Sequence, residues 1–302
     1  MMLPDPIHHF LFRQISTKPF QWMRIAWAFV TLCTLLMQWN DVAWYYSSQS
    51  FLQIFPDVLS LTVFPRFSLL HFVSDPTIVF ALYLALLLSL FFVLFGFGKR
   101  WMIIVCIVLL HSFHHRNPLP MGGGDVLLYN IGFLFMVTPN VDGISLVRWF
   151  VFRLNRSGDQ MKRMNEKQKT MPAWPYRLLL FQVILLYLSS FWWKLLGTMW
   201  VDGSAMEVVL RNPEFARFEL YPNFIHAIAP AIGYGTPLWE AAWVLLLIPG
   251  WKHHDRTQRA LIFSGILFHA GILLFLKVGS FSAALLVAYI GLWEEKKSTS
   301  TL

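Results

Sequence analysis

Lys194 is the residue in this sequence whose surroundings suggest chemistry. It lies in FWWKLLGTMWVDG, residues 191–203, directly after an apolar run that begins near Tyr176. Ionisable groups in apolar, membrane-like segments usually face the protein interior and mark a function. An ammonium group shielded from water loses its proton more readily, so Lys194 could act as a general base. Alternatively it stays charged and pairs with a carboxylate, or its side chain extends to the lipid headgroups. The candidate carboxylate partners are Asp202, Glu207 and Glu240.

Two further ionisable residues lie in apolar segments and could tune or reprotonate such a base. Glu240 follows Pro237 at the expected start of an apolar helix, where the helix dipole favours a carboxylate. The favourable dipole alone would explain Glu240 without a catalytic role. Glu240 is, however, also expected near the outer face of the membrane, at the same depth as Lys194, where it could be the partner of Lys194. His269 lies in the middle of LIFSGILFHAGILLF. A lone buried histidine is more often structural than catalytic. Within a bilayer, however, ionisable residues more often have a function, so a catalytic role for His269 stays open.

A third cluster is the polar turn HHRNPLPMGGGD, which ends at Asp125. Arg116 and Asp125 could form an ion pair across this turn. Alternatively, the glycines Gly122–Gly124 could expose backbone N–H groups to an anion at the start of a helix. His111, His114 and His115 have helical spacing, but no fourth ligand is evident nearby, so no metal site is expected.

The composition places these residues in a membrane protein. Of the 302 residues, 57% are hydrophobic and only 13% are charged, whereas a soluble domain carries about 25% charged residues. The net charge of +8 could suggest nucleic acid, but the basic residues lie between long apolar runs. A membrane partner is therefore preferred and nucleic acid is not expected.

The apolar runs predict an all-α, polytopic integral membrane helical bundle with about eight spans. A span needs about 20 largely apolar residues, and several of these runs are shorter. The outer stretch between the first two spans mixes aromatic residues, Ser and Pro, and should form one or two short interfacial helices. The expected spans are residues 21–39, 77–97, 101–115, 124–139, 177–196, 236–250, 259–277 and 280–293.

The positions of Lys and Arg predict the orientation. With eight spans, one side of the membrane collects 18 Lys/Arg and 7 Asp/Glu, so this side should be cytoplasmic. The expected organisation is a cytoplasmic segment 1–20, a transmembrane domain 21–293 with a cytoplasmic loop at about 140–176, and a cytoplasmic tail 294–302. Both termini are then cytoplasmic, and Lys194 faces the periplasm.

Three motifs together resemble the HTTM domain, the membrane module of vitamin K-dependent gamma-carboxylases and their bacterial relatives. They are RNPLPMGGGDVLLYN (residues 116–130), YLSSFWWKLLGTMWVDGSAM (187–206) and FHAGILLFLKVGSFS (268–282). The resemblance covers roughly residues 15–293. It implies a protein of the cell inner membrane.

The resemblance implies a role for individual residues. Lys194 occupies the position of the carboxylase lysine that is taken as the base starting the oxidation of reduced vitamin K, and His269 matches the histidine of the late helix. A reduced, vitamin K-like quinone is therefore the expected lipid-soluble molecule. Five more residues match these motifs and are candidates for binding a substrate or holding the turn: Trp200, Asp202, Arg116, Asn117 and Asp125.

The chain also departs from the carboxylase. It stops about ten residues after the last expected span, where the vertebrate enzyme has a long extramembrane region that helps bind its substrate protein. Phe191–Trp193 replace smaller residues and a second lysine. Peptide carboxylation is therefore not expected. Two interpretations remain open. The first is a carboxylase-like or oxidoreductase-like enzyme, a lyase or monooxygenase in type, that acts on a quinol-like or other lipid-soluble molecule. The second is a non-enzymatic protein that binds a lipid or assists maturation or export of a secreted peptide.

Overall fold

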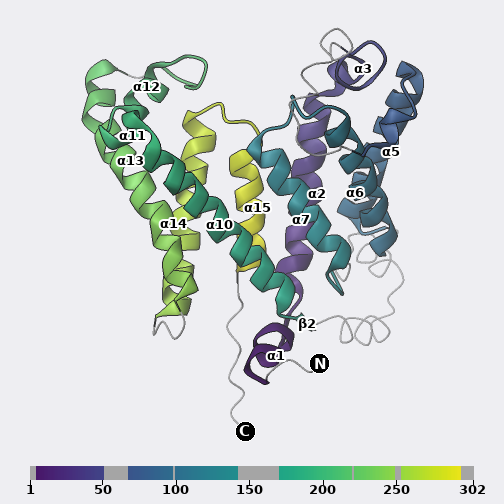
Figure 1. The fold of residues 1–302 in the computed structure, drawn as a ribbon, viewed down its shortest axis with the longest axis horizontal. Coiled ribbons are helices and arrows are strands. Elements are labelled where there is room, and N and C mark those ends of the chain that lie inside the picture. The colour runs from purple at the N-terminus through teal and green to yellow at the C-terminus, as the bar shows by residue number, and fades with distance from the viewer. Residues whose placement is uncertain are drawn as a thin grey trace, which may run out of the picture. The chain divides into compact units, whose positions relative to one another are not determined.

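The computed structural model describes residues 5–50, 67–97, 99–141, 170–219, 221–248 and 253–293. These residues form helices, apart from one short two-stranded ribbon (Figure 1). The chain divides into two compact units, residues 1–173 and 174–302. The expected all-α class is confirmed. Most of the loop expected at 140–176, the tail 294–302 and part of the outer stretch lie outside the described residues.

The described part of the first unit is built on four long helices. The helix α2 contacts α5 and α7, α5 contacts α6, and α6 contacts α7. Short elements flank them, and the strands β1 and β2 pair antiparallel. Its elements are α1 (Asp5–Phe12), β1 (Gln14–Ser16), α2 (Lys18–Met37), η1 (Trp39–Asp41), α3 (Val42–Tyr46), η3 (Leu69–His71), α5 (Pro76–Phe95), α6 (Lys99–Arg116), α7 (Gly123–Val137) and β2 (Thr170–Pro172).

Close packing of α2 against α7 forms the core of this unit. Trp27 is fully buried, and its indole N–H donates to the carbonyl of Leu128 at 2.7 Å. Gly132 permits the approach, since a Cβ there would lie 2.6 Å from the Trp27 ring. Asp75 begins α5 by accepting hydrogen bonds from the backbone of the first helical turn. The helices that carry the polar turn around Asp125 are therefore held rigidly.

The second unit contains the helices that carry Lys194. In this unit α10 contacts α13 and α15, and α14 contacts α15. The short helices α11 and α12 lie near the start of α13 (Figure 1). Its elements are α10 (Trp174–Leu196), α11 (Thr198–Val201), α12 (Ala205–Arg211), α13 (Pro222–Ala242), η4 (Trp243–Leu247), α14 (His254–Phe275) and α15 (Phe281–Leu292).

Within the described residues, four helices are long and apolar enough to cross a membrane: α2, α5, α10 and α14. The shorter helices α7 and α15 are also apolar. The expected number of eight spans is not confirmed. The sixth expected span, residues 236–250, differs from the structure, because α13 already begins at Pro222 and passes into the 3-10 helix η4 at Trp243. Short helical elements do occur in the described part of the outer stretch, as expected.

Candidate functional site

Lys194 lies in the last turn of α10, and its ammonium is held by two other side chains. Its Nζ donates to the Ser190 hydroxyl at 2.5 Å and to the two Glu240 oxygens at 2.7 and 3.0 Å. Ser190 in turn donates to Glu240 at 2.9 Å. The Lys194 side chain is 15% exposed and the Glu240 side chain 5%. The three groups therefore form a closed polar cluster that is almost fully shielded.

The two helices explain why this cluster forms. Ser190 and Lys194 are four residues apart on α10 and so lie on one face of that helix. Glu240 belongs to α13, which packs against α10. The expectation that Glu240 opens a helix was wrong, because α13 ends at Ala242 and Glu240 is therefore in its last turn. The backbone runs on directly into the 3-10 helix η4. Lys194 supplies the positive charge beside the nearly buried Glu240 carboxylate.

Trp200 adds an aromatic surface to the cluster. Lys194 Nζ lies 5.0 Å from the centre of the Trp200 ring, a distance at which a cation is attracted to the ring face. Trp200 lies in α11, which follows α10 directly, because α10 ends before Gly197 and Gly197 caps the start of α11. This short connection places the Trp200 ring next to Lys194. The structure thus brings Lys194 and Trp200 together.

His269 belongs to a second polar cluster in the same unit. Its side chain is fully buried on α14. Nε2 lies 2.8 Å from the Tyr187 hydroxyl, and Nδ1 lies 3.1 Å from the Ser282 hydroxyl. The Tyr187 hydroxyl also contacts that of Tyr289. These contacts link α10, α14 and α15 through hydrogen bonds. They make His269 a satisfied core residue in the structure.

The two polar clusters lie along the same face of α10. Tyr187, Ser190 and Lys194 follow one another at spacings of three and four residues, which places them in one row. On the partner side, Trp243 stacks on the Tyr187 ring at 4.9 Å, and Glu240 lies three residues before Trp243. The offset between Tyr187 and Ser190 along the helix axis is about 4.5 Å. The row therefore carries two polar clusters about one turn apart.

Asp202 does not partner Lys194. Asp202 is exposed and accepts hydrogen bonds from the Ser204 hydroxyl at 2.6 Å and the Ser204 backbone at 2.9 Å. These two bonds lower the pKa of the Asp202 carboxyl below its usual value. Glu207, the other candidate partner, pairs with Arg211 at 2.7 Å. Of the three carboxylates considered from the sequence, Glu240 is the one that contacts Lys194.

Arg116, Asn117 and Asp125 all belong to the first unit. Arg116 donates to the Tyr46 carbonyl at 3.3 Å, and Asn117 donates to the Tyr45 carbonyl at 3.0 Å. Asp125 accepts the backbone N–H of Gly122 at 2.7 Å and so caps the start of α7. These contacts fix the turn after α6.

The histidines of α6 are not arranged as a metal site. Among the described residues, no group of three or more His, Cys, Asp or Glu side chains could hold a metal ion. His111 contacts the Tyr129 hydroxyl through Nδ1 at 2.8 Å. The rings of His111 and His115 lie 3.9 Å apart.

Sequence reasoning missed Ser190, Tyr187, Tyr289 and Ser282. A helical spacing signal existed for two of them, since Ser190 and Tyr187 lie four and seven residues before Lys194. Tyr289 and Ser282 could not be found in this way, because their contact with α14 depends on how α15 packs.

Comparison with known proteins gives one match. The family model for the HTTM domain matches residues 143–295, about half of the chain. The matched segment contains the whole Lys194 cluster and the His269 cluster. Comparisons with curated proteins and with solved structures give no match.

Proposed function

Because the chain belongs to the HTTM domain family, we propose that it is a membrane protein that removes a proton from a weakly acidic, lipid-soluble molecule at Lys194. The proposal rests on one observation above all. Lys194 is almost buried, yet 15% of its side chain is exposed beside Glu240, Ser190 and Trp200. A group of this kind can be reached by a molecule from the lipid while water is largely excluded.

The partner carboxylate gives Lys194 a way to become a base. In water an ammonium and a carboxylate stay ionised, but shielding from water penalises both charges. The hydrogen bond of 2.7 Å between Lys194 and Glu240 lets the proton pass from the ammonium to the carboxylate. Lys194 is then a neutral amine and can accept a proton from an O–H group. The anion that results stays next to the new ammonium, which stabilises it.

A reduced quinone has the chemistry that this site would act on, since its ring carries weakly acidic hydroxyls. The residues fit such a ring. The Trp200 ring offers a flat surface at 5.0 Å from Nζ, and aromatic side chains commonly line sites for flat molecules. Ser190 could hold the Lys194 amine in place by its bond of 2.5 Å during the transfer.

A second function is favoured by a different feature of the same cluster. The Lys194 ammonium has three acceptors, namely the Ser190 oxygen and both Glu240 oxygens. Since all three N–H groups of the ammonium can have an acceptor, Lys194 can serve as a structural residue that links α10 to α13. In that case the protein is a non-enzymatic membrane protein that binds a lipid or helps a secreted peptide to mature.

Two variants separate these functions, because arginine keeps the charge but cannot give up its proton. Protein in lipid nanodiscs is mixed with a reduced naphthoquinone and oxygen, and the rate of quinol consumption is compared with that of empty nanodiscs. Deprotonated quinol reacts faster with oxygen, so the protein should accelerate consumption. Both Lys194→Ala and Lys194→Arg should lower this acceleration at least about 100-fold, as expected for the loss of a general base.

A matched control is Lys277→Arg, since Lys277 is an exposed lysine that donates to the Pro213 carbonyl. This variant should keep the wild-type acceleration. If Lys194→Arg keeps it as well, Lys194 is a structural residue that links α10 to α13, and the base proposal is wrong. Absence of acceleration by the wild-type protein would also exclude the quinol proposal.

A further inference from the structure

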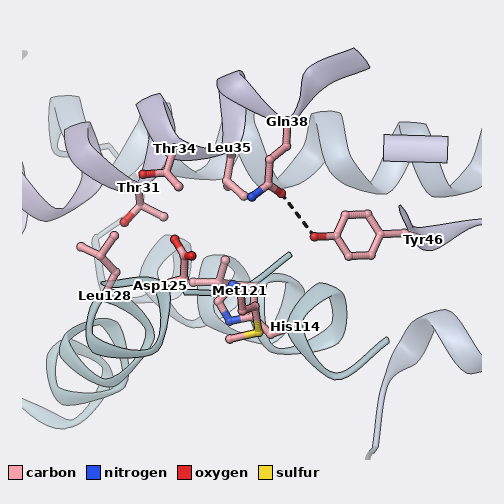
Figure 2. Close-up of a pocket in the computed structure, with 10 residues that line it drawn as sticks. Thr31, Thr34, Leu35, Gln38, Tyr46, His114, Met121, Asp125 and Leu128 are labelled. Carbon is pink, nitrogen blue, oxygen red and sulfur yellow. Dashed lines mark hydrogen bonds between the residues drawn. The ribbon is translucent and has the colours of Figure 1, made fainter. Parts of the chain in front are cut away.

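Two features of the first unit take no part in the proposed function. The first is a pocket between α2, α3, α6 and α7, where the Tyr46 hydroxyl donates to Gln38 at 3.3 Å (Figure 2). Its volume is about 10 Å³, which is room for about one water molecule. This pocket is therefore too small for a substrate or a lipid. The second feature is α1, a helix of eight residues whose apolar side is exposed.

The helix α1 has one apolar side and one polar side. At 3.6 residues per turn, Ile7, Phe10 and Leu11 fall on one side of the helix. The imidazoles of His8 and His9 fall on the opposite side. A helix with this pattern is amphipathic, and its apolar side is expected to lie against another apolar surface.

The apolar side of α1 is nevertheless largely exposed. Ile7 is 47% and Phe10 is 50% exposed, and Leu11 is partly exposed. Contact between water and such side chains is unfavourable. Short amphipathic helices of membrane proteins solve this problem by lying in the plane of the membrane surface, with the apolar side among the acyl chains.

The connection to α2 keeps α1 within reach of a membrane. Residues 13–17 join α1 to α2, and α2 is long and apolar enough to cross a membrane. Even a fully extended connection of this length spans only about 20 Å. In Figure 1, α1 lies beyond the end of α2 at which α2 begins. The helix α1 is therefore close to the point at which the chain enters the membrane.

Exposed tryptophans mark the depth of the membrane surface at this end of the first unit. Trp22 lies four residues after the start of α2 and is 53% exposed. Trp101 lies two residues after the start of α6 and is 73% exposed. The starts of α2 and α6 lie at the same end of the unit (Figure 1). Because tryptophan is enriched at the boundary between lipid and water, both rings place this boundary next to the connection that carries α1.

The charges near α1 suit an anionic membrane surface. The stretch 6–18 contains the cations Arg13 and Lys18 and no Asp or Glu. Lys18 is exposed at the start of α2, and Arg13 is partly exposed. The distribution of Lys and Arg predicts that α2 begins on the cytoplasmic side, where the leaflet carries anionic lipids. Cations at this level favour contact between α1 and the headgroups.

We propose that α1 lies flat on the cytoplasmic leaflet of the membrane that α2 crosses. Ile7, Phe10 and Leu11 then contact acyl chains, and His8 and His9 face the water. Lipid is favoured over a second copy of the chain, because three side chains offer far less area than a stable interface between two proteins needs. This contact does not involve Lys194, so its test and the quinol test can fail separately.

Fluorescent labels on opposite sides of α1 test this arrangement. Cys33 and Cys106 are replaced by alanine, and Ile7→Cys and His9→Cys are introduced separately and labelled with nitrobenzoxadiazole. The full-length proteins are placed in vesicles of phosphatidylcholine and phosphatidylglycerol. Lipids with a nitroxide near the top of the acyl chain should quench the label at position 7 at least about 2-fold more than the label at position 9. Iodide in the water should show the opposite preference.

Three results would overturn the proposal. Quenching of both labels by iodide alone would mean that α1 extends into the water. Equal quenching of both labels by the nitroxide lipids would mean that no side of α1 faces the water. Protection of the label at position 7 from both quenchers would mean that protein covers the apolar side. If this protection is lost when the vesicles hold less protein per lipid, the covering surface belongs to a second copy of the chain.

A second pair of variants identifies the side of α1 that holds the helix on the membrane. Phe10→Ser, combined with the label at position 7, removes an apolar ring and should lower quenching by the nitroxide lipids at least about 2-fold. The matched control His9→Ser changes the opposite side and should leave this quenching unchanged. Both positions are exposed, so neither change disturbs the core of the first unit. If Phe10→Ser keeps the full quenching, the apolar side does not hold α1 on the lipid and the proposal is wrong.

Discussion

At the scale of single residues, the Tyr187 hydroxyl connects three helices through one oxygen atom. It contacts His269 Nε2 on α14 and the Tyr289 hydroxyl on α15, while its own ring is carried by α10. A hydroxyl can donate one hydrogen bond and accept others, so Tyr187 serves both partners at once. Both partners are buried.

Tyr187→Phe should therefore destabilise the protein more than an equivalent change elsewhere. It keeps the ring but leaves His269 Nε2 and the Tyr289 hydroxyl each short of a partner, and the free energy of unfolding should fall by about 2 to 3 kcal/mol. The matched control is Tyr83→Phe, since the buried Tyr83 hydroxyl donates to one carbonyl, that of Leu35. The control should cost about 1 kcal/mol. Thermal unfolding in one detergent compares them, and equal losses would argue against the linking role of Tyr187.

The sequence predicted the pairing of Lys194 with Glu240 as one of several possibilities but could not select it. Asp202 is nearer in the chain, yet its carboxylate is used by Ser204 in a local turn. Local hydrogen bonds of this kind compete with long-range pairs and depend on backbone geometry. The long-range choice of Glu240 follows from the packing of α10 on α13, which no spacing rule gives.

At the scale of the helices, two glycines of α14 have different surroundings. A Cβ on Gly265 would lie 2.4 Å from the Tyr289 hydroxyl, so α15 can approach only because this position is a glycine. A Cβ on Gly271 would have no atom within 4 Å. The close approach at Gly265 is what brings Tyr289 to Tyr187.

Gly265→Ala and Gly271→Ala should accordingly have opposite effects. The first forces Tyr289 or α15 to move and should cost about 1 to 3 kcal/mol of unfolding free energy. The second favours the helix and should leave stability unchanged or raise it by up to about 1 kcal/mol. Thermal unfolding of both variants measures the difference. A stable Gly265→Ala protein would mean that α14 and α15 are not packed as described.

The helices themselves were largely predictable from the apolar runs, with α13 as the exception. Pro230 was expected to lie before the sixth span and Pro237 at its start, yet both are inside α13. Proline removes one backbone hydrogen bond and usually ends a helix in water. In membrane proteins neighbouring helices and local 3-10 turns can satisfy the freed carbonyls. Because the helix was predicted to begin at residue 236, Glu240 was placed in its first turn, whereas in the structure Glu240 lies in the last turn of α13.

At the scale of the whole molecule, the distribution of Lys and Arg predicts how the chain is oriented in the membrane. The second unit carries two exposed acidic residues near its opposite ends, Asp202 after α11 and Asp255 at the start of α14 (Figure 1). The distribution of Lys and Arg predicts that Asp202 faces the outside and Asp255 the cytoplasm.

Labelling of single cysteines tests this orientation. Cys33 and Cys106 are first replaced by alanine, and Asp202→Cys and Asp255→Cys are then introduced separately. A thiol reagent that cannot cross membranes should modify Asp202→Cys in intact cells, and Asp255→Cys only after permeabilisation. The reverse pattern would place Lys194 on the cytoplasmic face. Modification of both in intact cells would mean that α13 and η4, which lie between the two positions, do not carry the chain across the membrane as expected.

Glu240 lies in the last turn of α13 and is almost buried, and Lys194 is the cation that contacts its carboxylate there. A visiting molecule that attracts the ammonium to itself would leave that carboxylate uncompensated. A guest that binds as proposed above would therefore be selected by its protonation state: a neutral acid brings the proton that Glu240 then lacks, whereas its salt does not. Uptake should accordingly follow the concentration of the uncharged form of the guest.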